Sequence, residues 1–95
     1  MNQKVLFIDR DGTLIKEPIG YQVDSYAKLQ FLEGVISALK TIVSWNEYEL
    51  VLVSNQDGLG TESFRFEDFE GPHQLMLDIL ESEGVVFSEV FIDCS

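Results

Sequence analysis

The chain has 95 residues, of which 17 are Asp or Glu and 6 are Lys or Arg, so its formal net charge at pH 7 is −11. That length fits a single domain, and the acid surplus argues against nucleic acid as a partner, because no basic patch is present to neutralise phosphates. The single cysteine, Cys94, excludes a disulfide framework and a multi-thiolate zinc site. No segment has the pattern of a signal peptide or of a membrane span, so we expect a cytoplasmic protein.

Three short apolar runs predict β-strands, at residues 5–8, 51–53 and 90–92. The first run, Val-Leu-Phe-Ile, has no polar residue between its apolar ones, and such a run is typical of a strand covered on both faces. The other two runs have the same character, and polar residues follow each of them at once. The pattern therefore predicts three strands of a parallel sheet, the first of them buried on both sides.

Two helical stripes lie between the predicted strands. Apolar residues recur at helical spacing over residues 34–45 and again over residues 72–83, which predicts two amphipathic helices. Gly84 is placed to end the second helix in a left-handed conformation. His73 directly follows Pro72, so we expect it near the N-terminal end of that helix.

The order strand, helix, strand, helix, strand is that of two βαβ units. It predicts an α/β fold whose parallel sheet is built by right-handed crossovers, with ligands bound beyond the carboxyl ends of the strands. Polar residues follow all three strands: Asp9 and Asp11, then Ser54 and Asn55, then Asp93. Turn formation alone explains any one of them, but three strand ends that converge predict a binding site.

The segment DRDGT at residues 9–13 carries the sharpest chemistry. Its two carboxylates, two residues apart after a buried strand, are placed to share one divalent cation, and Mg²⁺ prefers such oxygen ligands. Gly12 allows a sharp turn that brings backbone N–H groups toward a ligand. Calcium loops also begin D-x-D-G, but the twelfth position counted from Asp9 is Gly20, which cannot supply the required carboxylate.

These residues resemble a known family. VLFIDRDGT at residues 5–13 is similar to the first motif of the haloacid dehalogenase-like phosphohydrolases, and LVLVSN at residues 50–55 is similar to their second, an apolar strand ending in Ser or Thr. NQDGLGT, with FIDRDGTLI, EP, YQVDS and GPH, resembles the histidinol-phosphate phosphatase subgroup over essentially the whole chain. The resemblance implies a three-layer, Rossmann-like α/β fold, of which residues 1–95 form the N-terminal portion of a single phosphatase domain.

The resemblance also implies roles by position. Asp9 would be the nucleophile that forms an aspartyl-phosphate, and Asp11 the acid that protonates the leaving group and then activates water. Mg²⁺ would bind the Asp9 carboxylate and the Asp11 backbone carbonyl. Ser54 would donate its hydroxyl to the phosphoryl group, with Asn55 beside it. The implied reaction is hydrolysis of L-histidinol phosphate, a small phosphate monoester of histidine biosynthesis.

Several neighbouring residues have two interpretations. Glu17, in the loop after the nucleophile, either binds a substrate ammonium group or is solvated, and Ser54 is either a phosphate ligand or an ordinary turn residue. Gln56 and Asp57 either contact substrate or simply form the turn of NQDG. Arg10 would add positive charge for phosphate binding near an acidic site.

The sequence departs from the family pattern after the third strand. A lysine and an acidic pair are expected after that strand to complete the site, but the lysines of the chain, Lys4, Lys16, Lys28 and Lys40, all precede the second strand. We therefore expect negligible phosphatase activity from this chain alone. Many relatives begin a zinc loop at the same point with Cys-x-His. Asp93 and Ser95 stand at those two positions and Cys94 is out of register, so we expect no zinc.

Two other classes remain alternatives. A fragment or interaction module of the same fold would bind Mg²⁺ or phosphate without turnover, and a phospho-acceptor receiver domain also places an acidic cluster and magnesium on a parallel sheet. The receiver is disfavoured, because D-x-D-G-T and NQDGLG do not belong to it. We expect a small phosphate monoester as the partner, and neither nucleic acid nor a membrane. The strand at residues 5–8 would expose one edge, through which the chain would self-associate.

Overall fold

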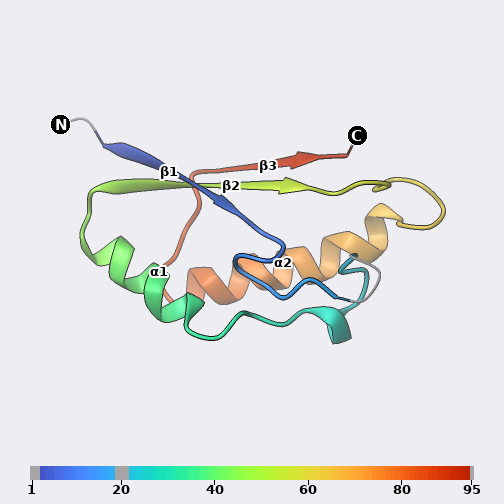
Figure 1. Ribbon diagram of the computed structural model, residues 1–95, viewed down its shortest axis with the longest axis horizontal. Coiled ribbons are helices and arrows are strands. Elements are labelled where there is room, and N and C mark those ends of the chain that lie inside the picture. The colour runs from blue at the N-terminus through green and yellow to red at the C-terminus, as the bar shows by residue number, and fades with distance from the viewer. Residues whose placement is uncertain (1–2, 19–21, 95) are drawn as a thin grey trace.

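The computed structural model describes residues 3–18 and 22–94, which form a parallel sheet and two α-helices (Figure 1). In chain order the elements are β1 (Lys4–Asp9), the 3₁₀ helix η1 (Tyr26–Lys28), α1 (Val35–Ser44), β2 (Tyr48–Asn55), α2 (Phe66–Ser82) and β3 (Glu89–Asp93). Both strand pairs are parallel, which confirms the predicted α/β class. Gly20 and Ser95, on which the calcium and zinc arguments partly rest, lie outside the described residues.

The strands lie in the order β1-β2-β3, so β2 is the central strand. Both connections step in the same direction across the sheet, and Figure 1 shows α1 and α2 together below the strands. Crossovers of one hand that step in one direction place their helices on one side of the sheet. The described residues therefore form a sheet and one helical layer, two of the three layers expected.

The core lies between the sheet and this helical layer. Ile8 of β1 packs there with Leu50 and Leu52 of β2, because residues two apart on a strand share a face. Burial of one such side chain stabilises the fold by roughly 1.5–3 kcal/mol. The core therefore fixes the carboxyl ends of β1 and β2 relative to each other. The helices contribute Leu39, Met76 and Leu80 to the same cluster.

The opposite face of the sheet is open in the described residues. Val5 and Phe7 of β1 are 46% and 66% exposed, and Phe91 of β3 is 51% exposed. The prediction that the first strand is covered on both faces is therefore wrong for this part of the chain. The physical reason is that both helices lie on the other side of the sheet, so no helix of the described residues covers this face (Figure 1).

α2 begins more than one turn earlier than predicted. Its first residue is Phe66, so Pro72 and His73 lie inside the helix rather than near its start. Glu67 and Asp68 occupy the first turn, where negative charge is stabilised by the helix dipole. Pro72 lacks an N–H group and removes one intrahelical hydrogen bond, but the helix continues through it. The helical stripe was visible in the sequence, whereas its polar first turn was not.

α2 ends where the sequence predicts. Gly84 has a φ of 82°, and the backbone N–H of Val85 donates to the carbonyl of Leu80 at 2.8 Å. This is the pattern of a helix closed by a left-handed residue. With 17 residues α2 is the longest helix of the described part of the chain, and no helix there is long and apolar enough to cross a bilayer.

Candidate active site

The carboxyl ends of β1 and β2 open into one cavity. Asp9, the last residue of β1, pairs in register with Val53, so the loops that follow the two strands begin side by side. This is the edge at which parallel α/β sheets bind their ligands. A cavity of about 470 Å³ lies between the loops, and its lining consists of Asp9, Asp11, Glu17, Gln22, Asn55, Gln56 and Asp57.

Most of the predicted site residues reach this cavity, but Arg10 and Ser54 do not line it. Both are only 1% exposed, so their side chains lie behind the cavity wall. Asp57, for which the sequence left two interpretations, lines the cavity, as does Glu17 from the loop after β1. Gln22 also lines it, although no sequence signal singled it out.

The backbone of Arg10 folds the loop that carries Asp11. Its carbonyl oxygen accepts hydrogen bonds from the N–H groups of Thr13, Leu14 and Ile15 at 3.3, 2.9 and 3.2 Å. Gly12 has a φ of 79°, a left-handed conformation that a residue without Cβ adopts easily. Because Leu14 and Ile15 are also fully buried, the loop is anchored in the core immediately beyond this turn.

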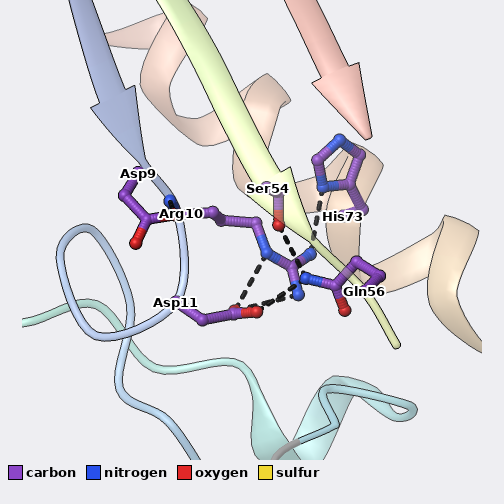
Figure 2. A network of polar contacts seen from close by, with 6 residues as sticks. All are labelled: Asp9, Arg10, Asp11, Ser54, Gln56 and His73. Atoms are coloured by element: carbon purple, nitrogen blue, oxygen red, sulfur yellow. Dashed lines mark hydrogen bonds and ion pairs between the residues drawn. The ribbon is translucent and has the colours of Figure 1, made fainter. Parts of the chain in front are cut away.

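Both carboxylate oxygens of Asp11 are held by side chains. Arg10 donates from Nε to Oδ1 at 3.0 Å, and Gln56 donates from Nε2 to Oδ2 at 2.6 Å (Figure 2). Arg10 is a residue of the same loop, whereas Gln56 follows β2, so the two donors approach from different strands. The arrangement fixes the orientation of this carboxylate from two sides.

The carboxylate of Asp9 is less constrained by hydrogen bonds than that of Asp11. Its side chain is exposed and lines the cavity, and its Oδ1 accepts the backbone N–H of Arg10 at 3.0 Å. The two carboxylates of the DxD motif therefore differ in environment, one open to the cavity and one clamped at its wall. Such a difference between paired carboxylates is what separates a nucleophile from an acid–base group.

Ser54, the residue before the last one of β2, is the third member of this polar cluster. Its Oγ accepts a hydrogen bond from Nε2 of Gln56 at 2.6 Å, and Gln56 is itself only 2% exposed. One buried amide group therefore joins the hydroxyl of Ser54 to the carboxylate of Asp11. Because a hydroxyl that accepts one hydrogen bond keeps its proton, Ser54 can still donate.

Arg10 is buried against α2. Its Nη1 lies 3.1 Å from Nδ1 of His73, and its guanidinium carbon lies 5.0 Å from the centre of the Phe69 ring. The rings of Phe69 and His73 stack with their centres 4.8 Å apart. Figure 2 shows the guanidinium group between Asp11 and His73. The helix therefore contacts the residue between the two site carboxylates.

Burial and charge keep His73 neutral. The pKa of His73 is lowered from 6.5 to about 4, chiefly by burial and also by the positive charge of Arg10, while the negative charge of Asp11 acts in the opposite direction. Burial also lowers the pKa of Arg10, while the ion pair and hydrogen bond with Asp11 and the charge of Asp9 raise it. An arginine nevertheless stays protonated in proteins, so the pair consists of a cationic Arg10 and a neutral His73.

Phe69 and His73 were not predicted from the sequence to be site residues. Their spacing of four places them on one face of a helix, which is the signal that could have found them. That signal depends on a helix that already includes residue 69, whereas the sequence predicted a start at residue 72. Arg10 was predicted to add positive charge for phosphate binding, but its side chain is buried and does not line the cavity.

The donor set of the cavity suits a hard cation. Its lining consists of carboxylate and amide side chains, and Mg²⁺ binds such oxygens while keeping several waters. Residues 3–18 and 22–94 contain no group of three or more His, Cys, Asp or Glu side chains arranged around one metal position. The oxygen donors of the lining fit a magnesium ion, and the Asp9 carboxylate is exposed among them.

Comparison with known proteins gives a consistent result. Residues 4–93 match the family model described as polynucleotide kinase 3 phosphatase. The chain is 56% identical over 91 residues to the histidine biosynthesis bifunctional protein HisB of Xanthomonas campestris pv. campestris strain B100, which covers 96% of this chain and 24% of that protein. It is 53% identical over 91 residues to the protein of the same name from Stenotrophomonas maltophilia strain K279a. The chain thus spans about a quarter of the length of these relatives.

Solved structures show the same fold. The D,D-heptose 1,7-bisphosphate phosphatase of B. bronchiseptica, complexed with magnesium and phosphate, superposes with a TM-score of 0.81 at 26% identity, over 95% of this chain and 49% of that one. A putative HAD-like phosphatase of Mesorhizobium loti superposes with a TM-score of 0.79 at 24% identity, over 97% of this chain and 43% of that one. The match over residues 4–93 places the chain in the polynucleotide kinase 3 phosphatase family, and the superpositions show that it has the fold of haloacid dehalogenase-like phosphatases.

Proposed function

We propose that this chain carries the nucleophile and the acid–base group of a magnesium-dependent phosphomonoesterase that hydrolyses L-histidinol phosphate. The observation that carries the proposal is the contrast between two carboxylates at one cavity. Asp9 is exposed there, whereas Asp11 is held through both oxygens by Arg10 and Gln56. The names of the relatives at 53–56% identity, which assign them to histidine biosynthesis, support the choice of pathway.

In the first step a carboxylate oxygen of Asp9 attacks the phosphorus atom of the monoester. The bond between phosphorus and the substrate oxygen breaks, and Asp11 gives its proton to the departing alkoxide. Asp9 is then an aspartyl-phosphate and Asp11 is ionised. In the second step Asp11 takes a proton from water as the water oxygen attacks phosphorus, which releases phosphate and restores both residues.

Gln56 is suited to both protonation states of Asp11. Its amide carries a donor and an acceptor, so it can donate from Nε2 to the ionised carboxylate or accept with Oε1 from the protonated one. In the structure Nε2 faces Oδ2 of Asp11 at 2.6 Å, which matches the ionised state.

The Asp9 carboxylate and the Asp11 backbone carbonyl would hold Mg²⁺. When bound, the ion would neutralise negative charge on the phosphoryl oxygens. The oxygen donors of the cavity support this assignment, as does the magnesium and phosphate complex of the heptose bisphosphate phosphatase. The amide of Asn55 adds a polar group to the cavity lining, and the buried hydroxyl of Ser54 lies behind that lining, hydrogen-bonded to Gln56.

The charge of the cavity favours a substrate with a cationic group. Glu17 and Asp57 line it in addition to the two reacting carboxylates, and among the described residues no Lys or Arg does. An ammonium group such as that of L-histidinol phosphate would be attracted to these acids, whereas the many phosphates of a polynucleotide would be repelled. This is why we prefer an amino phosphomonoester to the nucleic acid named in the family description.

The test uses a chimera in which residues 4–93 replace the matching segment of Xanthomonas campestris HisB. We expect phosphate release from L-histidinol phosphate and far less from a 3′-phosphorylated oligonucleotide. Asp9→Asn should abolish turnover, while Asp78→Asn on the exposed side of α2 should leave it intact. Equal activity of Asp9→Asn and the unmodified chimera would contradict the assignment of the nucleophile.

A binding domain without turnover is the second candidate. It is favoured by one observation, the lack of any Lys or Arg in the described lining of the cavity, because phosphoryl transfer depends on positive charge at the phosphoryl oxygens. The two candidates differ in the chimera. Magnesium binding without phosphate release, measured by calorimetry beside the kinetic assay, would support the binding domain and exclude the esterase.

A further inference from the structure

We propose that His73 is a positioning residue of the site: together with Phe69 it fixes the guanidinium group of Arg10, and through Arg10 it orients the carboxylate of Asp11. The inference rests on the proposed function, because it concerns the group to which that proposal gives the proton transfers. It adds α2, which contributes nothing to the cavity lining, to the elements that determine the reaction.

The burial of Arg10 makes partners for its guanidinium group necessary. Its side chain is 1% exposed, and a buried guanidinium group is stable only when its N–H groups and its charge are matched. Nε donates to Asp11 Oδ1 at 3.0 Å and Nη1 contacts His73 Nδ1 at 3.1 Å. Nη2 lies 3.0 Å from Asp11 Oδ1 as an ion pair, but within the described residues it has no hydrogen-bond partner. The guanidinium group is therefore held by one residue on each side.

The contact with Arg10 determines the tautomer of His73. A guanidinium group can only donate, so Nδ1 must accept, and the proton of the neutral ring must be on Nε2. The low pKa of His73 agrees with this neutral form at ordinary pH. The contact thus has a fixed polarity, with Arg10 as donor and His73 as acceptor.

The helix α2 gives this contact a rigid support. His73 is in the middle of α2, and its ring stacks on Phe69 one turn earlier at 4.8 Å and 20° between the ring planes. Phe69 also lies under the guanidinium group at 5.0 Å, where a cation–aromatic contact is favourable. Two side chains of one helix therefore hold Arg10 from different directions, which a loop residue alone could not do.

The orientation of the Asp11 carboxylate therefore depends on His73. Loss of the His73 acceptor leaves a buried N–H group of Arg10 without a partner. The guanidinium group then lowers its free energy by turning toward other oxygens. Asp11 Oδ1 moves with it, because Nε and Nη2 both contact that oxygen. Small displacements of a proton-transfer group cost about 10²-fold in rate, so the effect should appear in kcat rather than in substrate binding.

The kinetic test uses three variants of the chimera described above. His73→Leu removes the acceptor, His73→Asn keeps an oxygen near the position of Nδ1, and Met76→Ala disturbs the packing of the same helix at a buried residue away from Arg10. We expect His73→Leu to lower kcat about ten- to hundredfold with KM changed less than about twofold. His73→Asn should recover most of kcat, and Met76→Ala should lose stability but not kcat.

Loss of kcat in all three variants alike would overturn the proposal, since it would show only a structural need for α2. Unchanged kcat in His73→Leu would overturn it as well. If the unmodified chimera released no phosphate from L-histidinol phosphate, the proposed function would fail. The positioning contact would then be tested by the second measurement, which does not need activity.

The second measurement is ¹⁵N NMR of the chain itself, in which His73 is the sole histidine and its ring signals need no assignment. We expect the Nε2–H tautomer and a slowly exchanging Nε–H signal of Arg10. That arginine signal should broaden or vanish in His73→Leu and persist in His73→Asn. An Nδ1–H tautomer, or an arginine signal unaffected by His73→Leu, would contradict the contact.

Discussion

Gln56 donates a hydrogen bond from Nε2 to Oδ2 of Asp11 at 2.6 Å, although 45 residues separate them in the chain. The same nitrogen lies 2.6 Å from Oγ of Ser54. The buried amide therefore connects the loop after β1 to the end of β2, and it is a structural as well as a chemical part of the site.

Replacement of Gln56 by Leu should destabilise the chain. The change leaves the Oδ2 atom of Asp11 and the hydroxyl of Ser54 without this donor in a largely buried setting, which costs about 1–3 kcal/mol for an unsatisfied group. Urea denaturation of the chain measures the loss. Gln30→Leu, at an exposed position, is the control and should change the free energy of unfolding by less than about 0.5 kcal/mol. Equal effects of the two changes would contradict the role of Gln56.

The two carboxylates of the DxD motif should respond differently to the same substitution. Asp11→Asn removes the negative charge beside a guanidinium group that is 1% exposed, and an uncompensated buried charge costs roughly 3 kcal/mol. Asp9→Asn alters an exposed side chain and should change the free energy of unfolding by less than about 0.5 kcal/mol. Urea denaturation of both variants at pH 7 tests this order, and a greater loss in Asp9→Asn would reverse our assignment.

Protonation of His73 should contribute to the pH dependence of the free energy of unfolding. The folded state keeps the imidazole neutral down to about pH 4, whereas the unfolded chain takes up the proton near pH 6.5. The unfolded state therefore binds more protons between these values, so stability falls as the pH decreases from 6.5 toward 4. The slope contributed by this group approaches about 1.4 kcal/mol per pH unit in that window.

His73→Asn provides the matched control for this titration. The charged groups that face the imidazole are Arg10 and Asp11, and they remain in the variant. The difference in unfolding free energy between the two proteins, measured from pH 4.5 to pH 7.5, isolates the histidine from the titration of the many carboxylates. A difference that does not vary with pH would show that the folded and unfolded states bind this proton equally.

The order of strands and helices was accessible from the sequence because it depends on local patterns. Continuous apolar runs at residues 5–8 and 51–53 and a helical stripe at residues 34–45 each signal their own element. The position of the site followed from topology, since the ends of parallel strands meet at one edge. The DxD pair therefore came to the cavity as predicted.

The polar network behind the cavity could not be predicted from local sequence patterns. The contact of Arg10 with His73 joins residues 63 apart, and it exists only because α2 packs against the loop after β1. Pro72 suggested a helix start, which hid the shared face of Phe69 and His73. The open face of the sheet was missed for a related reason, because an apolar strand has the same composition whether its second face is covered or bare.

The 95-residue chain on its own should show negligible phosphatase activity. Among the described residues no Lys or Arg lines the cavity, so nothing there neutralises the phosphoryl oxygens except a bound cation. Loss of one such electrostatic group commonly lowers the rate by about 10²–10³-fold. Phosphate release from L-histidinol phosphate, compared with the HisB chimera at equal concentration, measures the deficit. Comparable rates for the two would mean that the described residues already form a complete site.

The chain should self-associate through the open face and the free edge of β1. Val5 and Phe7 are 46% and 66% exposed on an edge strand, and Phe91 continues the same apolar face on β3. Exposed edges and contiguous apolar patches pair with other chains. The net charge of −11 opposes association, so screening should favour it: at 0.15 M salt the Debye length is about 8 Å. Sedimentation across a salt series should therefore show the average mass rising with ionic strength.

Two lysine substitutions distinguish association through this surface from nonspecific association. Phe7→Lys places a charge on the edge strand and should keep the chain monomeric at all salt concentrations. Phe66→Lys changes a phenylalanine of similar exposure, 56%, at the start of α2 and away from the sheet. It should leave the salt dependence unchanged, because β1 and its face are untouched. A monomer at every salt concentration in the unmodified chain would show that the open face drives no association. Equal effects of the two substitutions would place the contact elsewhere than on β1.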